Sequence, residues 1–232
     1  MPESNASLKK ELQEKASITG ADLFGVADLS EARQFIKENY EDISQQYPKA
    51  LSIGVYFPAK IINLLEMGPQ QVYSYYYEVL NNKLDELALI ITNYLFKAGY
   101  DALPIPASQQ LMHNKYKSMF SHRLAASLAG LGWIGKSCCL VNEKFGPRLR
   151  LVTVLTGAPL EPDLPVANKC GNCTACVDAC TPGAIKGLPF EPAQSLRERF
   201  DAKACDKHFQ RLKEQYGIGN CGKCLAACPW GK

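Results

Sequence analysis

The sequence predicts an α+β protein made of two parts. An α/β layer domain is expected over residues 1–160, because helices and strands alternate there and a hairpin pattern follows late. A small metal-binding module is expected over residues 166–232, where the cysteines crowd together. Pro159, Pro162 and Pro165 mark the linker between the two parts.

The first cysteine group has the spacing C-x2-C-x2-C-x3-C. Its members are Cys170, Cys173, Cys176 and Cys180. In this run three thiolates on one tight loop hold one [4Fe–4S] cluster, and the fourth cysteine reaches the other cluster. A second group ends in Cys-Pro and consists of Cys221, Cys224 and Cys228. The chain is therefore expected to carry electrons.

Two clusters need eight thiolate ligands, and Cys205, upstream of the second group, is the candidate for the eighth. Following the crossed pattern, we expect one cluster on Cys170, Cys173, Cys176 and Cys228. We expect the other cluster on Cys180, Cys205, Cys221 and Cys224.

Zinc and disulfides are the alternatives for these cysteines. Structural zinc takes four tetrahedral thiolates and has no use for a third closely spaced cysteine with a crossed fourth ligand. Many thiols on short loops, in a chain that opens without an export signal, favour metal binding over disulfides. Cys138 and Cys139 are predicted as small buried residues that face opposite ways on a strand, with a contact to a cofactor as the alternative.

Composition narrows the class of protein. A hydrophobic content of 47% in 232 residues supports one substantial core plus a small module. The net charge of +3 is too small to argue for nucleic-acid binding by itself. The polar N-terminus lacks the apolar centre of a signal peptide, and no apolar run approaches the ~18 residues of a membrane span. We expect a cytoplasmic protein without a membrane partner.

The pattern of apolar residues predicts the elements of the first part. Helices are expected at 8–18, from Ser30, at 70–98 and at 121–131, and a further helix at 206–216. Strands are expected at 21–28, 50–57, 101–105, 137–142 and 149–156. The last two strands should form a hairpin across Gly146-Pro147. The buried stripe of the long helix is predicted as Val72, Tyr76, Leu80, Leu84, Leu87, Ile91 and Leu95.

The segment 121–136 is rich in glycine and alanine, which allow close approach of backbone or of a bulky ligand. Gly130, Gly132 and Gly135 follow a helix rather than a strand, so a dinucleotide-binding loop is not indicated. Lys136 could meet an acidic group of a cofactor. A tight structural turn and a cofactor-binding surface both remain open at this point.

The segment Ala129-Gly-Leu-Gly-Trp-Ile-Gly-Lys136, the proline linker and the two cysteine groups together resemble epoxyqueuosine reductases and their short relatives. That family is similar to the reductive dehalogenases. The resemblance implies a nitroreductase-like domain that binds a corrinoid (cobalamin), fused to a two-cluster ferredoxin module that supplies it with electrons. On this basis the corrinoid site is expected to include His122, Arg123, Gly130, Gly132, Trp133, Gly135 and Lys136. His122 and Arg123 could instead cap a neighbouring element.

Two departures from the family bear on the substrate. The tRNA-modifying members carry a catalytic Asp where an ungapped count places Tyr116, which could donate a proton or simply pack against Phe120. Many of them also have a helical-repeat extension that holds tRNA, whereas this sequence stops just after Trp230. We therefore do not expect tRNA as the partner. Lys144, Arg148 and Arg150, around the predicted hairpin turn, could dock an acidic donor or be solvated.

The leading hypothesis is an iron–sulfur oxidoreductase with two [4Fe–4S] clusters and a corrinoid, either a corrinoid-dependent reductase or an activator of another protein's corrinoid. Its partners would be a low-potential donor of the ferredoxin or flavodoxin type and, for an activator, a corrinoid protein. The alternatives are an epoxyqueuosine reductase of tRNA queuosine synthesis and a non-catalytic electron-transfer protein of the ferredoxin type.

Overall fold

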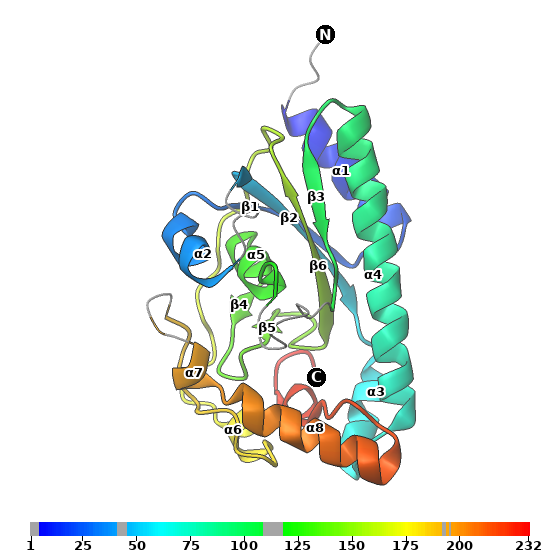
Figure 1. Cartoon of the computed structure of the whole chain (residues 1–232), viewed down its shortest axis with the longest axis vertical. Coiled ribbons are helices and arrows are strands. Elements are labelled where there is room, and N and C mark those ends of the chain that lie inside the picture. The colour runs from blue at the N-terminus through cyan, green and yellow to red at the C-terminus, as the bar shows by residue number, and fades with distance from the viewer. Residues whose placement is uncertain (1–4, 41–45, 109–117, 192–193, 195) are drawn as a thin grey trace. The chain divides into compact units, whose positions relative to one another are not determined.

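The computed structural model of the protein describes residues 5–40, 46–108, 118–191, 194 and 196–232. These residues form two compact units that interleave along the sequence (Figure 1). The first unit consists of Met1–Val55, Asn81–Gly132 and Arg150–Val166. The second unit consists of Tyr56–Leu80, Trp133–Leu149 and Ala167–Lys232.

The observed units differ from the predicted division at residues 160–166. The linker prolines do fall at the end of the last segment of the first unit. The difference arises because two earlier segments, 56–80 and 133–149, are compact with the cysteine-rich part rather than with the sheet. The division into 1–160 and 166–232 stays a prediction about domains.

A four-stranded sheet forms the centre of the first unit. Its strands, in spatial order, are β1 (Leu23–Asp28), β2 (Lys49–Tyr56), β6 (Leu149–Thr156) and β3 (Ala102–Ile105). The β1–β2 and β3–β6 pairs are antiparallel. The two central strands, β2 and β6, are buried along nearly their whole length, which is why their sequences are continuous apolar runs instead of alternating ones.

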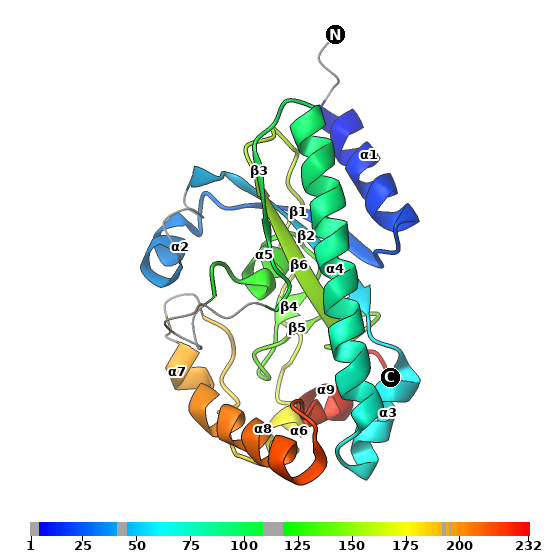
Figure 2. The ribbon, with the colours of Figure 1, turned by 45° about the vertical axis from the view of Figure 1, so that its right-hand side comes forward.

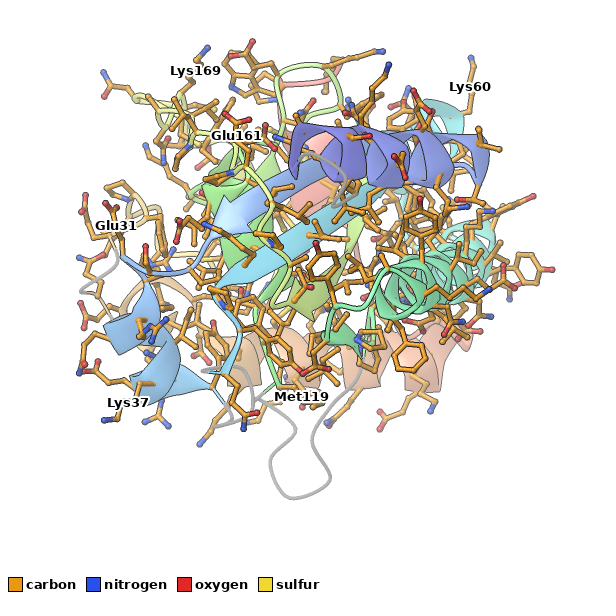
Figure 3. All side chains as sticks on the ribbon, turned by 90° about the horizontal axis from the view of Figure 1, so that it is seen from above. Glu31, Lys37, Lys60, Met119, Glu161 and Lys169 are labelled. Atoms are coloured by element: carbon orange, nitrogen blue, oxygen red, sulfur yellow. The ribbon has the colours of Figure 1, made fainter. Side chains whose placement is uncertain are left out.

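Helices cover both faces of this sheet. Helix α1 (Asn5–Ile18) and the C-terminal half of α4 (Gln71–Lys97) lie on one face, and α5 (His122–Leu128) lies on the other (Figures 1 and 2). Helix α5 sits close to β1 because a side chain is missing there: a Cβ on Gly25 would lie 2.6 Å from the carbonyl oxygen of Ala129. The short helix α2 (Arg33–Asn39) buries only Ile36, and its Lys37 projects outward (Figure 3).

Most of the predicted elements of the first unit are confirmed, including the long helix and the strands β1, β2, β3 and β6. Within α4 the predicted stripe is right for Leu84, Leu87, Ile91 and Leu95, which are fully buried. It is wrong for Tyr76, which is 39% exposed, because the helix instead turns Tyr73 inward. The ring of Tyr73 packs against that of Phe57 with 5.0 Å between centroids.

The predicted hairpin across Gly146-Pro147 is wrong. Only Leu140–Val141 of the segment 137–142 is a strand (β5), and it pairs with β4 (Trp133–Ile134), whereas β6 joins the large sheet. The turn itself is closed by backbone hydrogen bonds in both directions between Asn142 and Gly146. Two short apolar runs beside Gly146-Pro147 thus predicted a turn near Gly146, but not the residues that close it nor the partner of each strand.

The second unit contains short helices around the cysteines. They are α3 (Ala59–Leu64), the 3-10 helix η2 (Leu65–Met67), α6 (Ala175–Asp178), α7 (Leu196–Arg199), α8 (Ala202–Tyr216) and α9 (Lys223–Ala227). A small core joins α9 to η2 and α3 and consists of Phe57, Ile62, Leu65, Tyr73 and Ala226. Gly222 starts α9 with φ +71°, and a Cβ there would lie 2.6 Å from Cδ1 of Leu65. In the part of the chain that the structure describes, no helix is long and apolar enough to cross a membrane.

His122 ties α5 to its surroundings. Its Nε2–H donates to the carbonyl oxygen of Pro106 (3.0 Å), and its Nδ1 accepts from the hydroxyl of Thr153 on β6 (2.9 Å). The neutral imidazole satisfies both contacts, with one ring nitrogen as donor and the other as acceptor. Burial, together with the smaller effects of the charges of Arg150 and Arg123, lowers the pKa of His122 to about 4 against the opposing effect of the hydrogen bond to Pro106.

The stability that His122 contributes should therefore depend on pH. The histidine of the unfolded chain takes up a proton below its ordinary pKa of 6.5, but that of the folded chain does so only near pH 4. The contribution is fully present above about pH 6.5 and is lost as the pH falls towards 4. The free energy of unfolding of the wild-type protein should fall between about pH 7.5 and about pH 5.5. In His122→Gln, whose side chain cannot titrate, we expect this fall to be smaller by on the order of 1 kcal/mol, a figure that allows for partial exposure of the histidine. Urea unfolding of both proteins at the two pH values measures this, and identical pH dependence would contradict it.

Candidate metal centre

The first cysteine group lies on a loop and the short helix that follows it. The loop turns tightly, with Gly171 at φ +48° and the amide of Cys173 donating to the carbonyl of Cys170 (3.1 Å). Cys176 lies within α6, and Cys180 follows directly after that helix. The cysteine spacing therefore places three sulfurs around one turn and carries the fourth past the end of the helix.

The second set of cysteines comes from two helices. Cys205 lies in the first turns of α8, and Cys224 lies in α9, with Cys221 just before α9 and Cys228 at its C-terminal cap. Helix α9 packs against α6, so segments about fifty residues apart along the chain bring their cysteines together. Figure 1 shows α6 beside α8 in this unit.

Four sulfurs form what we term sulfur group one. Burial raises the pKa of the Cys176 thiol to about 11, and charge on Cys170, Cys228, Cys139 and Cys173 adds to the rise. Burial also raises the pKa of Cys228, with further contributions from Cys170 and Cys173. Such mutual influence requires proximity. Sulfur group one consists of Cys170, Cys173, Cys176 and Cys228.

Four other sulfurs form sulfur group two. Burial raises the pKa of Cys205 to about 12, and charge on Cys180 and Cys221 adds to the rise. The pKa of Cys224 is raised first by a hydrogen bond to Cys139 and then by burial, with Cys221 and Cys205 contributing further. Sulfur group two consists of Cys180, Cys205, Cys221 and Cys224.

The two groups are named after the ligand sets that the crossed pattern predicts, and Cys139 acts on members of both. They are defined by electrostatic influence and not by coordination geometry. Among the described residues, no set of three or more His, Cys, Asp or Glu side chains is arranged to hold a single metal ion. The assignment of each cysteine as a ligand is therefore taken up as a proposal below.

The adjacent pair Cys138 and Cys139 differs from the prediction. Cys138 is buried, as expected, but both residues precede β5 in a turn where Cys138 has φ +60°. The guanidinium of Arg199 lies 3.7 Å from the Cys138 sulfur. Cys139 is only partly buried and influences Cys176 of sulfur group one as well as Cys205 and Cys224 of group two. Sequence spacing carried no signal for this position of Cys139.

The segment 133–136 holds the loop of sulfur group one. The indole N–H of Trp133 donates to the sulfur of Cys170 (3.3 Å). The ammonium of Lys136 donates to the carbonyl oxygens of Gly171 (2.7 Å) and Cys173 (3.1 Å). A Cβ on Gly135 would lie 3.3 Å from the Cys170 sulfur and 2.7 Å from Val141, so this position is packed too closely for a side chain.

The other residues predicted for the corrinoid lie in the first unit. They are His122, Arg123, Gly130 and Gly132. Both ring nitrogens of His122 have partners, and Arg123 adds its charge beside this imidazole. Gly130 has φ +70°, and a Cβ there would lie 2.4 Å from the carbonyl oxygen of Leu164, which makes it a tight structural turn. A corrinoid role for these residues stays a prediction, and Tyr116 lies outside the described residues.

Arg148 does not lie in solvent at a hairpin turn, as the sequence suggested, but is 1% exposed. Its Nη1 donates to the carbonyl oxygens of Trp230 (3.4 Å) and Gly231, while Nε and Nη2 are buried without a hydrogen-bond partner. Its charge opposes the rise of the pKa of Cys228. A buried cation with unused donors, next to a sulfur group, fits the presence of a negatively charged group there.

The side chains of this arrangement are of the kind that binds iron–sulfur clusters. Thiolates are the ligands of such clusters, and hydrogen bonds to the sulfurs come from Trp133 for Cys170 and from the amide of Ala184 for Cys180 (3.2 Å). Residues 169–231 match the family described as a 4Fe-4S double cluster binding domain. This part of the chain is thus similar to double-cluster iron–sulfur domains.

Comparison with whole proteins points to two kinds of relative. The epoxyqueuosine reductase of Bacillus anthracis is 34% identical over 113 residues, which make up 48% of this chain and 30% of that protein. A solved epoxyqueuosine reductase with an epoxyqueuosine-modified tRNA stem loop has a TM-score of 0.65 at 20% identity, over 98% of this chain and 66% of that one. A reductive dehalogenase, described with a mechanism for B12-dependent dehalogenation, has a TM-score of 0.75 at 18% identity, over 100% of this chain and 32% of that one.

The predicted resemblance to epoxyqueuosine reductases is therefore confirmed. The fold resembles that of both epoxyqueuosine reductases and reductive dehalogenases, with a mixed α/β part and an iron–sulfur part. The chain spans only 30% of the length of the Bacillus anthracis relative. That the α/β part is nitroreductase-like stays a prediction.

Lys136 should matter for retention of a cluster on sulfur group one. Lys136→Met removes both bonds to the carbonyls of the cysteine loop, and we expect about fivefold faster iron release to a chelator, equivalent to about 1 kcal/mol. Lys169→Met is the matched control, because Lys169 makes a largely exposed ion pair with Glu143, which contributes little. Equal release rates for the two variants would contradict this role of Lys136.

Proposed function

We propose that the chain is an iron–sulfur oxidoreductase with two [4Fe–4S] clusters that supplies electrons to a bound corrinoid. One cluster would be held by Cys170, Cys173, Cys176 and Cys228. The other would be held by Cys180, Cys205, Cys221 and Cys224. When bound, such clusters supply one-electron transfer.

The observation that carries this proposal is that each sulfur group combines cysteines from both ends of the cysteine-rich segment. Charge on Cys170 and Cys173 adds to the raised pKa of Cys228, from the end of the chain, whereas charge on Cys180, from the first cysteine run, adds to the raised pKa values of Cys205 and Cys221. A zinc ribbon has no need of such an exchange of the fourth ligand, whereas a two-cluster ferredoxin module requires it. The match of residues 169–231 to a double-cluster domain supports the same reading.

The residues of the chain would serve the clusters in three ways. The thiols must lose their protons to become ligands, and the raised pKa values of Cys176 and Cys205 mean that metal binding must drive this loss. The buried Arg148 would offset negative charge on sulfur group one. The N–H groups of Trp133 and Ala184 would donate to ligand sulfurs of the two groups.

The substrate is a separate proposal. The names of the relatives favour epoxyqueuosine reduction, the first alternative given above, over the other functions. The same names oppose our expectation that tRNA is no partner, since one relative was solved with an epoxyqueuosine-modified tRNA stem loop. The fold likeness to a B12-dependent dehalogenase supports the corrinoid. We propose a ferredoxin or flavodoxin as the electron donor and the cytoplasm as the location.

The ligand assignment predicts how single cysteine variants will behave. Cys205→Ala should lower the iron content of anaerobically reconstituted protein from about eight to about four per chain, because one cluster loses a ligand. Cys138→Ala, which alters a buried cysteine outside both groups, should keep about eight.

Cys139→Ala tests the competing assignment, in which Cys139 replaces Cys205 as a ligand of group two. Iron analysis with EPR of the reduced protein measures all three variants. Loss of a cluster in Cys139→Ala together with retention in Cys205→Ala would contradict the assignment.

The proposed corrinoid and the proposed substrate each lead to one further prediction. Added Co(II) cobalamin should change its EPR spectrum to that of the base-off form when it binds the protein, whereas an unchanged spectrum with well-formed clusters would favour a non-catalytic electron-transfer protein.

Expression of the chain in a strain that lacks its epoxyqueuosine reductase should restore queuosine in tRNA. Corrinoid binding without this restoration would leave a reductase for a different substrate.

A further inference from the structure

Trp133 is a buried residue of the second unit whose ring and backbone both have partners. It is 2% exposed and lies on the two-residue strand β4, paired with Val141 of β5. Its ring meets that of Trp230 edge-on, with 5.1 Å between centroids and an interplanar angle of 81°. Pairing of its backbone and packing of its ring fix the direction of the indole.

That direction points the indole N–H at a predicted cluster ligand. Nε1 lies 3.3 Å from the sulfur of Cys170. An indole N–H is only a donor, and a buried one needs an acceptor. When Cys170 is a thiolate bound to iron, this bond has an ionised acceptor, which makes it stronger than a bond to a neutral thiol.

We propose that Trp133 is a positioning residue that raises the reduction potential of the cluster on sulfur group one through its N–H···S bond to Cys170. This inference rests on the proposed cluster ligands. Reduction adds one negative charge to the cluster, so a donor to a ligand sulfur stabilises the reduced form more than the oxidised form. The potential of the cluster on sulfur group two should not depend on this bond, because Trp133 donates to a ligand of group one.

The loop keeps other attachments when the indole N–H is removed. Asn168 donates to the carbonyl of Ile134 (3.2 Å) and accepts from the amide of Cys170 (2.9 Å). Lys136 adds its two bonds to the carbonyls of the loop. Trp133→Phe therefore removes the donor while these contacts hold Cys170 in place.

The test is a potentiometric titration followed by EPR on the fully reconstituted protein. Trp133→Phe should lower the reduced-to-oxidised ratio of one cluster about tenfold at a fixed potential, equivalent to about 59 mV for a one-electron couple. The second couple should not move. Trp230→Phe is the matched control, since phenylalanine keeps an aromatic ring against Trp133 and leaves the bond to Cys170, and it should leave both couples in place.

The Cys205→Ala background identifies the shifted couple, because only the cluster on sulfur group one should remain there. Unchanged couples in Trp133→Phe, or an equal shift of both, would overturn the inference. Failure of the wild-type protein to form two clusters would instead overturn the proposed function on which it rests.

If Trp133→Phe loses a cluster, a second measurement tests the N–H···S bond between Trp133 and Cys170. The chain has 2 tryptophans, so Trp230→Phe labelled with ¹⁵N-tryptophan carries the label at Trp133 alone. Pulsed EPR of its reduced cluster should show ¹⁵N hyperfine coupling from the indole. Absence of that coupling would overturn the inference.

Discussion

The gathering of eight cysteine thiols within one small unit is the constraint on which the rest of that unit depends. Burial and the neighbouring sulfurs raise the pKa of Cys176 and Cys205 far above that of an ordinary thiol. As free thiolates these sulfurs would repel one another in surroundings that solvate charge poorly, and metal binding removes this cost. The buried guanidinium of Arg148 and the hydrogen bonds to Cys170 and Cys180 act in the same direction.

Segments outside the cysteine-rich sequence complete this unit. Helix α9 rests on a small core with Leu65 and Tyr73, and the close approach of Gly222 to these side chains leaves no room for a Cβ. Trp133 and Lys136 reach the loop of sulfur group one from β4 and the turn after it. Residues 133–136, part of the set predicted for a corrinoid, thus contact a cysteine loop within the second unit. A substitution in 133–136 is therefore expected to act through the cluster on sulfur group one.

Sequence patterns were sufficient for features that depend on local chemistry, such as the strands β2 and β6, which follow from apolar runs. The crossed ligand sets remain a prediction from C-x2-C-x2-C-x3-C and the Cys-Pro ending. The features that depend on tertiary contacts could not be predicted. β5 pairs with β4 and not with β6, Tyr73 is buried in place of Tyr76, and Arg148 is buried beside the chain end. Nothing in the run Cys138-Cys139 indicates that Cys139 lies near both sulfur groups, since that depends on how the turn before β5 packs.

The most direct test of the account is the metal content and spin state of the centre. Anaerobically purified and reconstituted protein should contain about eight irons and about eight acid-labile sulfides per chain. Its Mössbauer spectrum should consist of [4Fe–4S] signals alone, in two populations of equal size. A stoichiometric zinc content, or about four irons with a single population in protein that retains all ten of its cysteines, would contradict the assignment of two clusters.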